Sequence, residues 1–99
     1  MEVSMFYVNV WLRVKEKKDI SKVAKLLTQM SQKTKLEDTC FRMEIYHSQS
    51  DESKFLLCEH WDSESGWKNH RNEQHFIEIY KAQVLPLVER EPHICKYLE

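Results

Sequence analysis

The chain has 99 residues, of which 41% are hydrophobic and 31% are charged, and its formal net charge is −1. This length, with no linker-like composition, predicts a single domain that spans residues 1–99. The near balance of charges argues against a strongly electrostatic partner such as a nucleic acid. No apolar run approaches the roughly 18–20 residues that cross a bilayer, so we expect no membrane association.

The cysteine and glycine contents further limit the compartment and the fold types that the chain can have. Cys40, Cys58 and Cys95 are odd in number, widely separated and free of any CxxC pair. Such cysteines are typical of reduced thiols, and the N-terminus lacks a signal-peptide pattern, so we expect a cytoplasmic protein. The single glycine excludes glycine-rich phosphate loops, and with them the P-loop and dinucleotide-binding folds.

The first predicted element is a strand over residues 5–14, in which two sets of side chains alternate. The first set is wholly apolar, and the second mixes aromatic side chains with Asn9 and Arg13. Both faces of this strand should therefore be covered. Helices can cover one face, and a second sheet, for example from another copy of the chain, can cover the other.

The next predicted elements are a helix and a hairpin. Asp19 is a suitable N-cap, and apolar residues at helical spacing follow it as far as Thr34. Residues 37–39 end the helix. Alternation then predicts a strand over residues 40–48. A polar turn leads into a strand at 55–61, whose mostly apolar and aromatic residues indicate burial on both faces.

A second helix and a last strand complete the chain. Asp62 or Ser63 can cap a helix that helical spacing extends towards Pro86. Setting about 100° per residue places one stripe of side chains on its inner face, with Tyr80 at the edge; the stripe consists of Trp67, His70, Ile77, Val84 and Val88. The charged segment 89–92 should then separate this helix from a strand at 93–98.

The predicted order is therefore strand, helix, strand, strand, helix, strand. This is the βαββαβ pattern of ferredoxin-like α+β folds, in which two helices lie on one face of an antiparallel sheet.

The spacing Glu59-x-Trp61-x-Ser63, then His70, then His75-Phe76, resembles the antibiotic biosynthesis monooxygenase (ABM) domain family of the dimeric α+β barrel superfamily. The resemblance implies a homodimer in which two sheets face each other. It also implies one of several activities. Members include cofactor-independent oxygenases of polyphenols and quinols, an isomerase of a signal breakdown product, and haem-degrading enzymes.

The resemblance also suggests roles for individual residues. Asn9 matches a functional Asn of haem degraders and several oxygenases, and Trp61 and His70 match residues at or near the family's pocket. Haem degraders also use a Trp and a His on the second helix. Those positions hold His70 and Tyr80 here, which argues against haem degradation.

The candidate catalytic residues are His70, Asn9 and Tyr80. An imidazole in an apolar stripe could hydrogen-bond a substrate or move a proton near neutral pH. Alternatively, a strand residue such as Asn9 or Tyr7 satisfies its ring nitrogens. Asn9 itself needs a partner, because leaving its amide buried and unpaired costs roughly 1–3 kcal/mol.

The candidate substrate-binding residues are Trp61, Trp67, Tyr46 and Tyr7. The indoles could wall a pocket for a planar substrate, and the tyrosines could supply hydroxyl groups, although large aromatics at such positions are also common core residues. His75 falls about 140° from His70 on an unbroken helix, so the two should not form a zinc pair. His75 could instead cap a second helical segment if the helix breaks, and we expect no metal and no cofactor.

Two classes of function remain. The first is a cofactor-independent monooxygenase or quinol oxygenase, in which His70 handles a proton, Asn9 binds a ring oxygen and the two indoles exclude water. The second is a non-catalytic dimeric protein, ligand-binding or stress-associated, that holds a small aromatic metabolite. An isomerase of a phosphorylated keto sugar is a weaker alternative, because it needs cationic anchors and nothing places Arg13 or Arg42 near His70.

Overall fold

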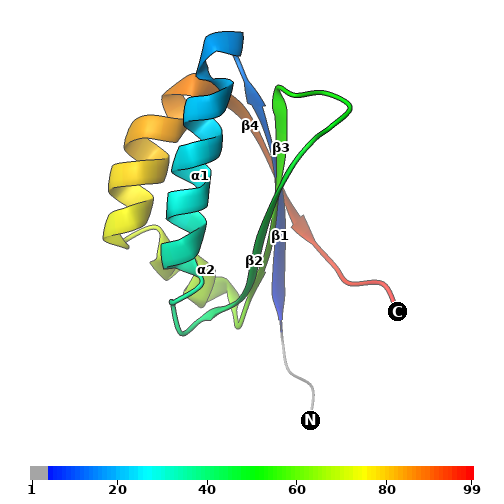
Figure 1. Cartoon of the computed structure of the whole chain (residues 1–99). Helices are drawn as coiled ribbons and strands as arrows, with labels where there is room; N and C mark the ends of the chain where they lie inside the picture. Colours follow the sequence, from blue (N-terminus) through cyan, green and yellow to red (C-terminus); the bar gives the residue numbers. More distant parts are fainter. Residues whose placement is uncertain (1–4) are drawn as a thin grey trace.

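The computed structural model describes residues 5–99, so residues 1–4 of the predicted domain lie outside the described part. Figure 1 shows two layers, a sheet and a set of helices packed on it. In chain order the elements are β1 (Phe6–Val14), η1 (Lys17–Asp19), α1 (Ile20–Thr34), β2 (Cys40–His47), β3 (Lys54–Trp61), α2 (Glu64–His70), η2 (Phe76–Val84), η3 (Leu85–Leu87) and β4 (Val88–Cys95).

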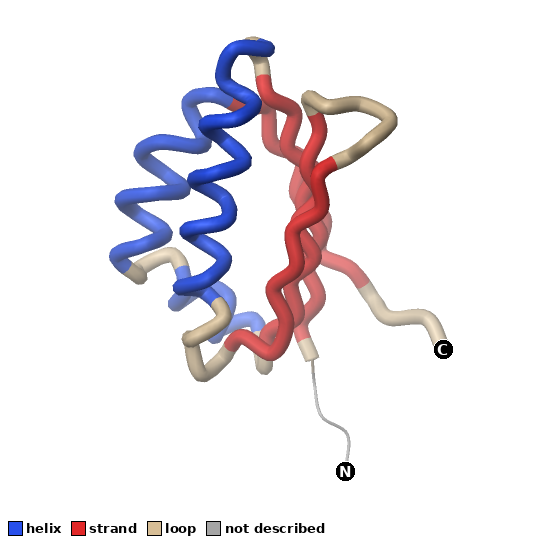
Figure 2. Tube along the Cα trace, viewed as in Figure 1, coloured by secondary structure: helices blue, strands red, loops and turns tan. Residues whose placement is uncertain are grey.

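The sheet is fully antiparallel, with strand order β2-β3-β1-β4. The helices lie on one face of it (Figure 2). The predicted ferredoxin-like α+β fold is therefore confirmed. This single sheet is open, and it does not close into a barrel within one chain.

The alternation read from the first strand sets its two faces. Val8, Val10, Leu12 and Val14 are at most 3% exposed and form the core beneath the helices. Opposite them, β3 directs its own alternate residues into the same layer. The apolar stripe of α1 packs on this layer, as its spacing predicts, with Val23, Leu26, Leu27, Met30 and Thr34 buried. This packing fixes the side of the sheet on which any internal site must lie.

The other sheet face carries the second set of β1 side chains. No element of residues 5–99 covers this outer face (Figure 2). Trp11 and Tyr46 remain 42% and 52% exposed there, and Tyr7, Asn9 and Cys58 are half-buried. We name this surface, made by the outward side chains of the four strands, the outer face.

The second helix does not run continuously towards Pro86; it breaks between His70 and His75, which is the alternative left open above for His75. Its first segment ends at His70, and a turn over residues 71–73 follows before the π-helix η2 begins. Amides of the turn bond to carbonyls three residues back, as in Glu73 N to His70 O at 3.1 Å, which tightens the chain out of α-helical geometry. Asn69 and Asn72, both weak helix formers, flank this point.

The break changes which side chains face inward directly after it. Ile77, which the unbroken helix places inward, is 46% exposed, whereas Ile79, Tyr80 and Val84 are buried. Val88, assigned to the same helical stripe, belongs to β4 and is buried there. The predicted stripe therefore holds for Trp67, His70 and Val84 and is wrong for Ile77.

The last strand also begins earlier than predicted. It runs over Val88–Cys95 rather than residues 93–98, and Pro92 lies inside it. Pro92 is tolerated because β4 is an edge strand that pairs only with β1, so an amide is not needed on its free side.

Two further features concern the cysteines and the helices. All three cysteines are free, and burial raises the pKa of Cys58 and raises that of Cys40 to about 11, so these two thiols stay protonated. Within residues 5–99, no helix combines the length and the apolar character that crossing a bilayer requires.

Candidate functional site

The start of α2 is fixed by a side-chain cap. Ser63 is the N-cap, and its Oγ accepts a hydrogen bond from the amide of Gly66 at 3.0 Å. Asp62, the alternative cap, instead accepts a hydrogen bond from Ser63 Oγ at 2.8 Å. This cap sets the direction of a short helix that carries Trp67 and His70 over the sheet.

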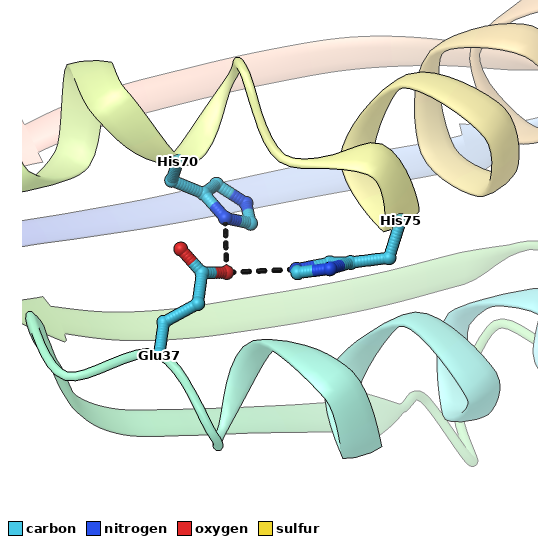
Figure 3. Close-up of side chains that lie close together, drawn as sticks. All are labelled: Glu37, His70 and His75. Atoms are coloured by element: carbon cyan, nitrogen blue, oxygen red, sulfur yellow. Dashed lines mark hydrogen bonds and ion pairs between the residues drawn. The ribbon is translucent and has the colours of Figure 1, made fainter.

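His70 is held by a carboxylate that the sequence did not single out. Its Nδ1 lies 2.6 Å from Oε2 of Glu37, in the loop after α1, and Nε2 of His75 lies 2.8 Å from the same oxygen (Figure 3). Neither Asn9 nor Tyr7 is a partner of His70, so that prediction is wrong. His75 has no side-chain capping bond to the next helical segment; it bonds to Glu37 instead.

The ring of His70 packs between aromatic groups. Its centroid is 4.8 Å from that of Trp61 and 5.0 Å from that of Phe76. Burial lowers the pKa of His70 and outweighs the opposing attraction of Glu37, because the ring is only 4% exposed. The imidazole is consequently neutral at neutral pH.

A buried carboxylic acid lies on the same side of the sheet. Glu59 is 6% exposed and accepts a hydrogen bond from Trp61 Nε1 at 3.0 Å. Burial raises its pKa to about 7, although the Trp61 hydrogen bond and the charges of Arg90 and Arg71 act in the opposite direction. Glu59 can therefore take up or release a proton near neutral pH.

Glu59 and His70 line a small internal cavity between the helices and the sheet. Its volume is about 10 Å³, which is the space of about one water molecule. Tyr80 also lines it and accepts a hydrogen bond from Arg90 Nε at 3.2 Å. The complete lining consists of Met30, Met43, Leu57, Glu59, Trp67, His70, Arg71, Phe76, Tyr80 and Arg90.

A larger pocket of about 210 Å³ shares a wall with this cavity. Trp67, Arg71 and Arg90 line both, and the pocket is completed by Val8 and by two exposed residues of β4. The Arg71 guanidinium lies over the Trp67 ring at 4.3 Å from its centroid. The pocket thus offers one aromatic wall and two cations, with Glu59 behind them. We name the pocket and the cavity together the edge site.

The structure brings only some of the candidate residues to the edge site. His70, Tyr80 and Trp67 line it. Trp61 is fully buried beside it and lines neither space, so its position is that of a core residue which holds Glu59.

The remaining candidates lie on the outer face, with the sheet between them and His70. Asn9 donates from Nδ2 to Cys95 Sγ at 3.2 Å, Tyr7 packs edge-on against His60, and Tyr46 bonds to Glu44. They are separated from His70 because they occupy the opposite phase of the strand alternation. Within one chain, Asn9 and His70 cannot act on the same substrate atom.

Four residues around the edge site and His70 were not among the site candidates predicted from the sequence. Glu59 could have been found, because it shares the inward phase of β3 with Phe55, Leu57 and Trp61. Glu37, Arg71 and Arg90 carry no such signal: each lies in a polar segment whose position depends on the folded chain.

The fold and the edge site together define a ferredoxin-like α+β domain with a small pocket at one edge of its sheet. A family model described as antibiotic biosynthesis monooxygenase matches residues 5–94, and the chain belongs to that family. A comparison with curated proteins finds no significant match in sequence.

Solved structures share the fold. A conserved protein from Bacteroides thetaiotaomicron is similar with a TM-score of 0.87 and 21% identity, over 97% of this chain and 100% of that one. Rv0793 from Mycobacterium tuberculosis has a TM-score of 0.84 and 25% identity, with 97% of each chain covered. A structure named antibiotic biosynthesis monooxygenase has a TM-score of 0.83 and 16% identity, over 94% of this chain and 99% of that one.

Proposed function

We propose that the protein is a monooxygenase that acts on a small phenol or quinol bound at the edge site. Membership of the antibiotic biosynthesis monooxygenase family supports this reaction class. The observation that carries the proposal is Glu59, a buried acid with a pKa of about 7 behind a pocket walled by Trp67 and two arginines.

A cytoplasmic location remains a prediction.

The substrate itself supplies the electrons in this proposal. A quinol and dioxygen give a hydroxyquinone and water, so one oxygen atom enters the ring, the other leaves as water, and no external reductant is consumed. The protein has to remove the phenolic proton, orient the ring and exclude water. An organic cofactor is not required for these steps.

Each residue of the edge site has a part in this scheme. Glu59 accepts the phenolic proton, and the positive charges of Arg71 and Arg90 favour the phenolate that results. Trp67 stacks on the ring. His70 and Tyr80 position the substrate from the inner cavity. Asn9, assigned to a ring oxygen from the sequence, has no part in a site within one chain.

The activity test is oxygen uptake with a panel of quinols. The variant Glu59→Gln should lower kcat by about 100-fold or more, because general bases typically contribute about 10²–10⁴-fold. Glu78→Gln is the matched control, since Glu78 is an exposed carboxylate on η2; it should leave kcat unchanged. Equal turnover by wild type and Glu59→Gln would remove Glu59 from the mechanism.

One observation favours the non-catalytic alternative, a protein that only binds an aromatic metabolite. The cavity beside Glu59 has a volume of about 10 Å³ and cannot admit a ring as it stands. In the pocket of about 210 Å³ a substrate reaches Glu59 only if a side chain such as Arg90 moves. Tight binding of a quinol without product, unaffected by oxygen, would support this alternative.

The positions of the arginines decide whether the isomerase alternative has the cationic anchors that it requires. Arg71 and Arg90 provide cations beside His70, whereas Arg13 and Arg42, considered from the sequence, pair with Glu89 and Glu44. An anionic substrate is therefore compatible with the edge site. The quinol panel should include a phosphorylated keto sugar as a competitor, because inhibition by it would identify an anion-binding function.

We also propose that two copies associate through the outer face. It is uncovered in one chain, it exposes Trp11 and Tyr46, and a hollow of about 460 Å³ lies beside Trp11 and Arg13. Exposed aromatic side chains are common at interfaces, and here they lie beside the ion pairs Arg13–Glu89 and Arg42–Glu44. A second sheet laid on it would bury the aromatic residues of β1, as the alternation of that strand predicts.

Replacing Trp11 with Asp should convert this dimer to a monomer. A charge at the centre of an apolar interface is strongly unfavourable without a partner. Analytical ultracentrifugation would report the mass. Ile77→Asp is the control, because Ile77 is similarly exposed, at 46%, but lies on the helical side. A monomeric wild type, or an unchanged dimer in Trp11→Asp, would contradict the interface.

A further inference from the structure

Three metal-ligating side chains meet on the side of His70 that faces away from the edge site. Glu37 comes from the loop after α1, His70 ends α2, and His75 precedes η2. Figure 3 shows both imidazole rings directed at one carboxylate oxygen. One nitrogen of each ring and this oxygen all lie within 4.8 Å of one another. The helix break creates this arrangement, because on an unbroken helix the two histidines diverge.

The carboxylate of Glu37 lacks a permanent cation. Its side chain is only 10% exposed, and its ion-pair partners among residues 5–99 are the two histidines. His75 is 10% exposed and His70 is 4% exposed. A buried carboxylate is most stable beside a full positive charge, which a bound metal ion would supply.

We infer that Glu37, His70 and His75 bind one divalent transition-metal ion. Two imidazole nitrogens and a carboxylate oxygen are a recurrent ligand set for Zn²⁺ and for Fe²⁺. The ion replaces the two N–H hydrogen bonds to Glu37 and provides the missing charge. None of the proposed oxygenase steps depends on it.

The required movements are small. Ligand atoms around a tetrahedral zinc ion lie about 3.3 Å apart, given bonds of about 2.0–2.1 Å. The two nitrogen–oxygen distances, now 2.6 and 2.8 Å, must therefore open by about half an ångström. The two nitrogens, which lie within 4.8 Å of each other, must draw together. Rotation of side chains can provide both changes.

The site has an open side for further ligands. Glu37, His70 and His75 line a surface hollow of about 440 Å³. Asp38 and Glu73 lie in the same hollow and favour a cation, while Lys33 opposes one. Water or the Glu73 carboxylate can complete the coordination, as in metal sites with three protein ligands and one open position.

The bound ion would join three segments that the chain otherwise connects through loops. It would link the end of α1 to both sides of the break after His70, and it would fix the His70 ring, which also lines the cavity of the edge site. The metal would therefore position His70 and stabilise the break. Metals that bind only the folded state add their binding free energy to stability.

The test is metal binding by the full chain after treatment with a chelator. Isothermal titration with ZnCl₂ should show one ion per chain, and CoCl₂ should give the visible absorption of cobalt with nitrogen and oxygen ligands. Glu37→Gln and His75→Gln should each weaken zinc binding by about 100-fold or more, because loss even of an outer-shell partner costs about 10–100-fold. Circular dichroism checks that each variant is folded, and Gln at position 37 keeps an acceptor for both imidazoles.

The chain provides a matched control. His93 and Glu91 form a similar pair, with His93 Nε2 2.7 Å from Glu91 Oε2, but both side chains are more than half exposed. His93→Gln should leave zinc binding unchanged. The inference is overturned if the wild type takes up no zinc, if neither Glu37→Gln nor His75→Gln weakens binding, or if His93→Gln weakens it equally. The readout is binding, so it is independent of whether the edge site oxidises a quinol.

Discussion

Glu59→Gln should make the protein more stable at pH 8 while it lowers kcat by about 100-fold or more. Burial raises the pKa of Glu59 to about 7 in the folded protein, from an ordinary value of 4.5. Above pH 7 the folded protein must hold an ionised carboxylate in a buried position, whereas glutamine is neutral and still accepts the Trp61 hydrogen bond. A difference of two to three pKa units corresponds to about 3 kcal/mol.

The sign of the pH dependence follows from the raised pKa. Protonated Glu59 has its stabilising effect in full below the unfolded value of 4.5, and this effect is lost as the pH rises through about 7. The variant should therefore match the wild type near pH 4 and exceed it by about 3 kcal/mol at pH 8. Urea unfolding at several pH values measures the difference.

Two outcomes would contradict this account of Glu59. A constant difference between the variant and the wild type at all pH values would mean that the carboxyl does not titrate near 7. A destabilised variant at pH 8 would mean that the ionised form has better partners in Arg71 and Arg90 than its burial indicates. Glu78→Gln, at an exposed position, should change stability little at any pH. A gain in stability with a loss of turnover is typical of a functional group in an unfavourable environment.

Strand alternation predicted most of the fold. The alternation of residues 6–14 separates the side chains beneath the helices from those of the outer face, and this separation is confirmed. The strand at 55–61 was predicted to be buried on both faces, which is wrong, because only its alternate residues are buried. The limits of β4 were wrong because a charged segment containing Pro92 resembles a loop in sequence. Its position beside β1 at the edge of the sheet is a tertiary property, and it makes both the charges and the proline acceptable.

The break after His70 was the main obstacle to predicting the site. Helical periodicity assumes one continuous helix, and a turn of three residues changes the phase of everything after it. Such a turn is encoded weakly, by Asn69 and Asn72, and it is stabilised by contacts from elsewhere. Glu37 is one such contact, 33 residues from His70. Neither the pairing of the histidines nor their shared carboxylate could be derived from spacing.

Gly66 shows how the cap of α2 is tied to the loop after α1. A Cβ at this position would lie 2.4 Å from Asp62 Oδ1 and 2.9 Å from Thr39 Cβ. Thr39 is held in place, because its carbonyl accepts the Asp62 amide at 2.9 Å, and Asp62 Oδ1 accepts from Ser63. The glycine is needed here for the close approach of a neighbouring segment rather than for its backbone freedom.

Gly66→Ala should therefore destabilise the protein, although alanine is normally about 1 kcal/mol more favourable than glycine within a helix. Overpacking costs about 1–3 kcal/mol, and the contact with Thr39 is too short for a small adjustment, so after the alanine gain we expect a net loss of about 1 kcal/mol. Ser65→Ala, at the exposed neighbouring position, is the control and should change stability by less than about 0.5 kcal/mol. Urea unfolding measures both. A more stable Gly66→Ala variant would show that α2 can move away from Thr39, and that the positions of Trp67 and His70 are not fixed by this contact.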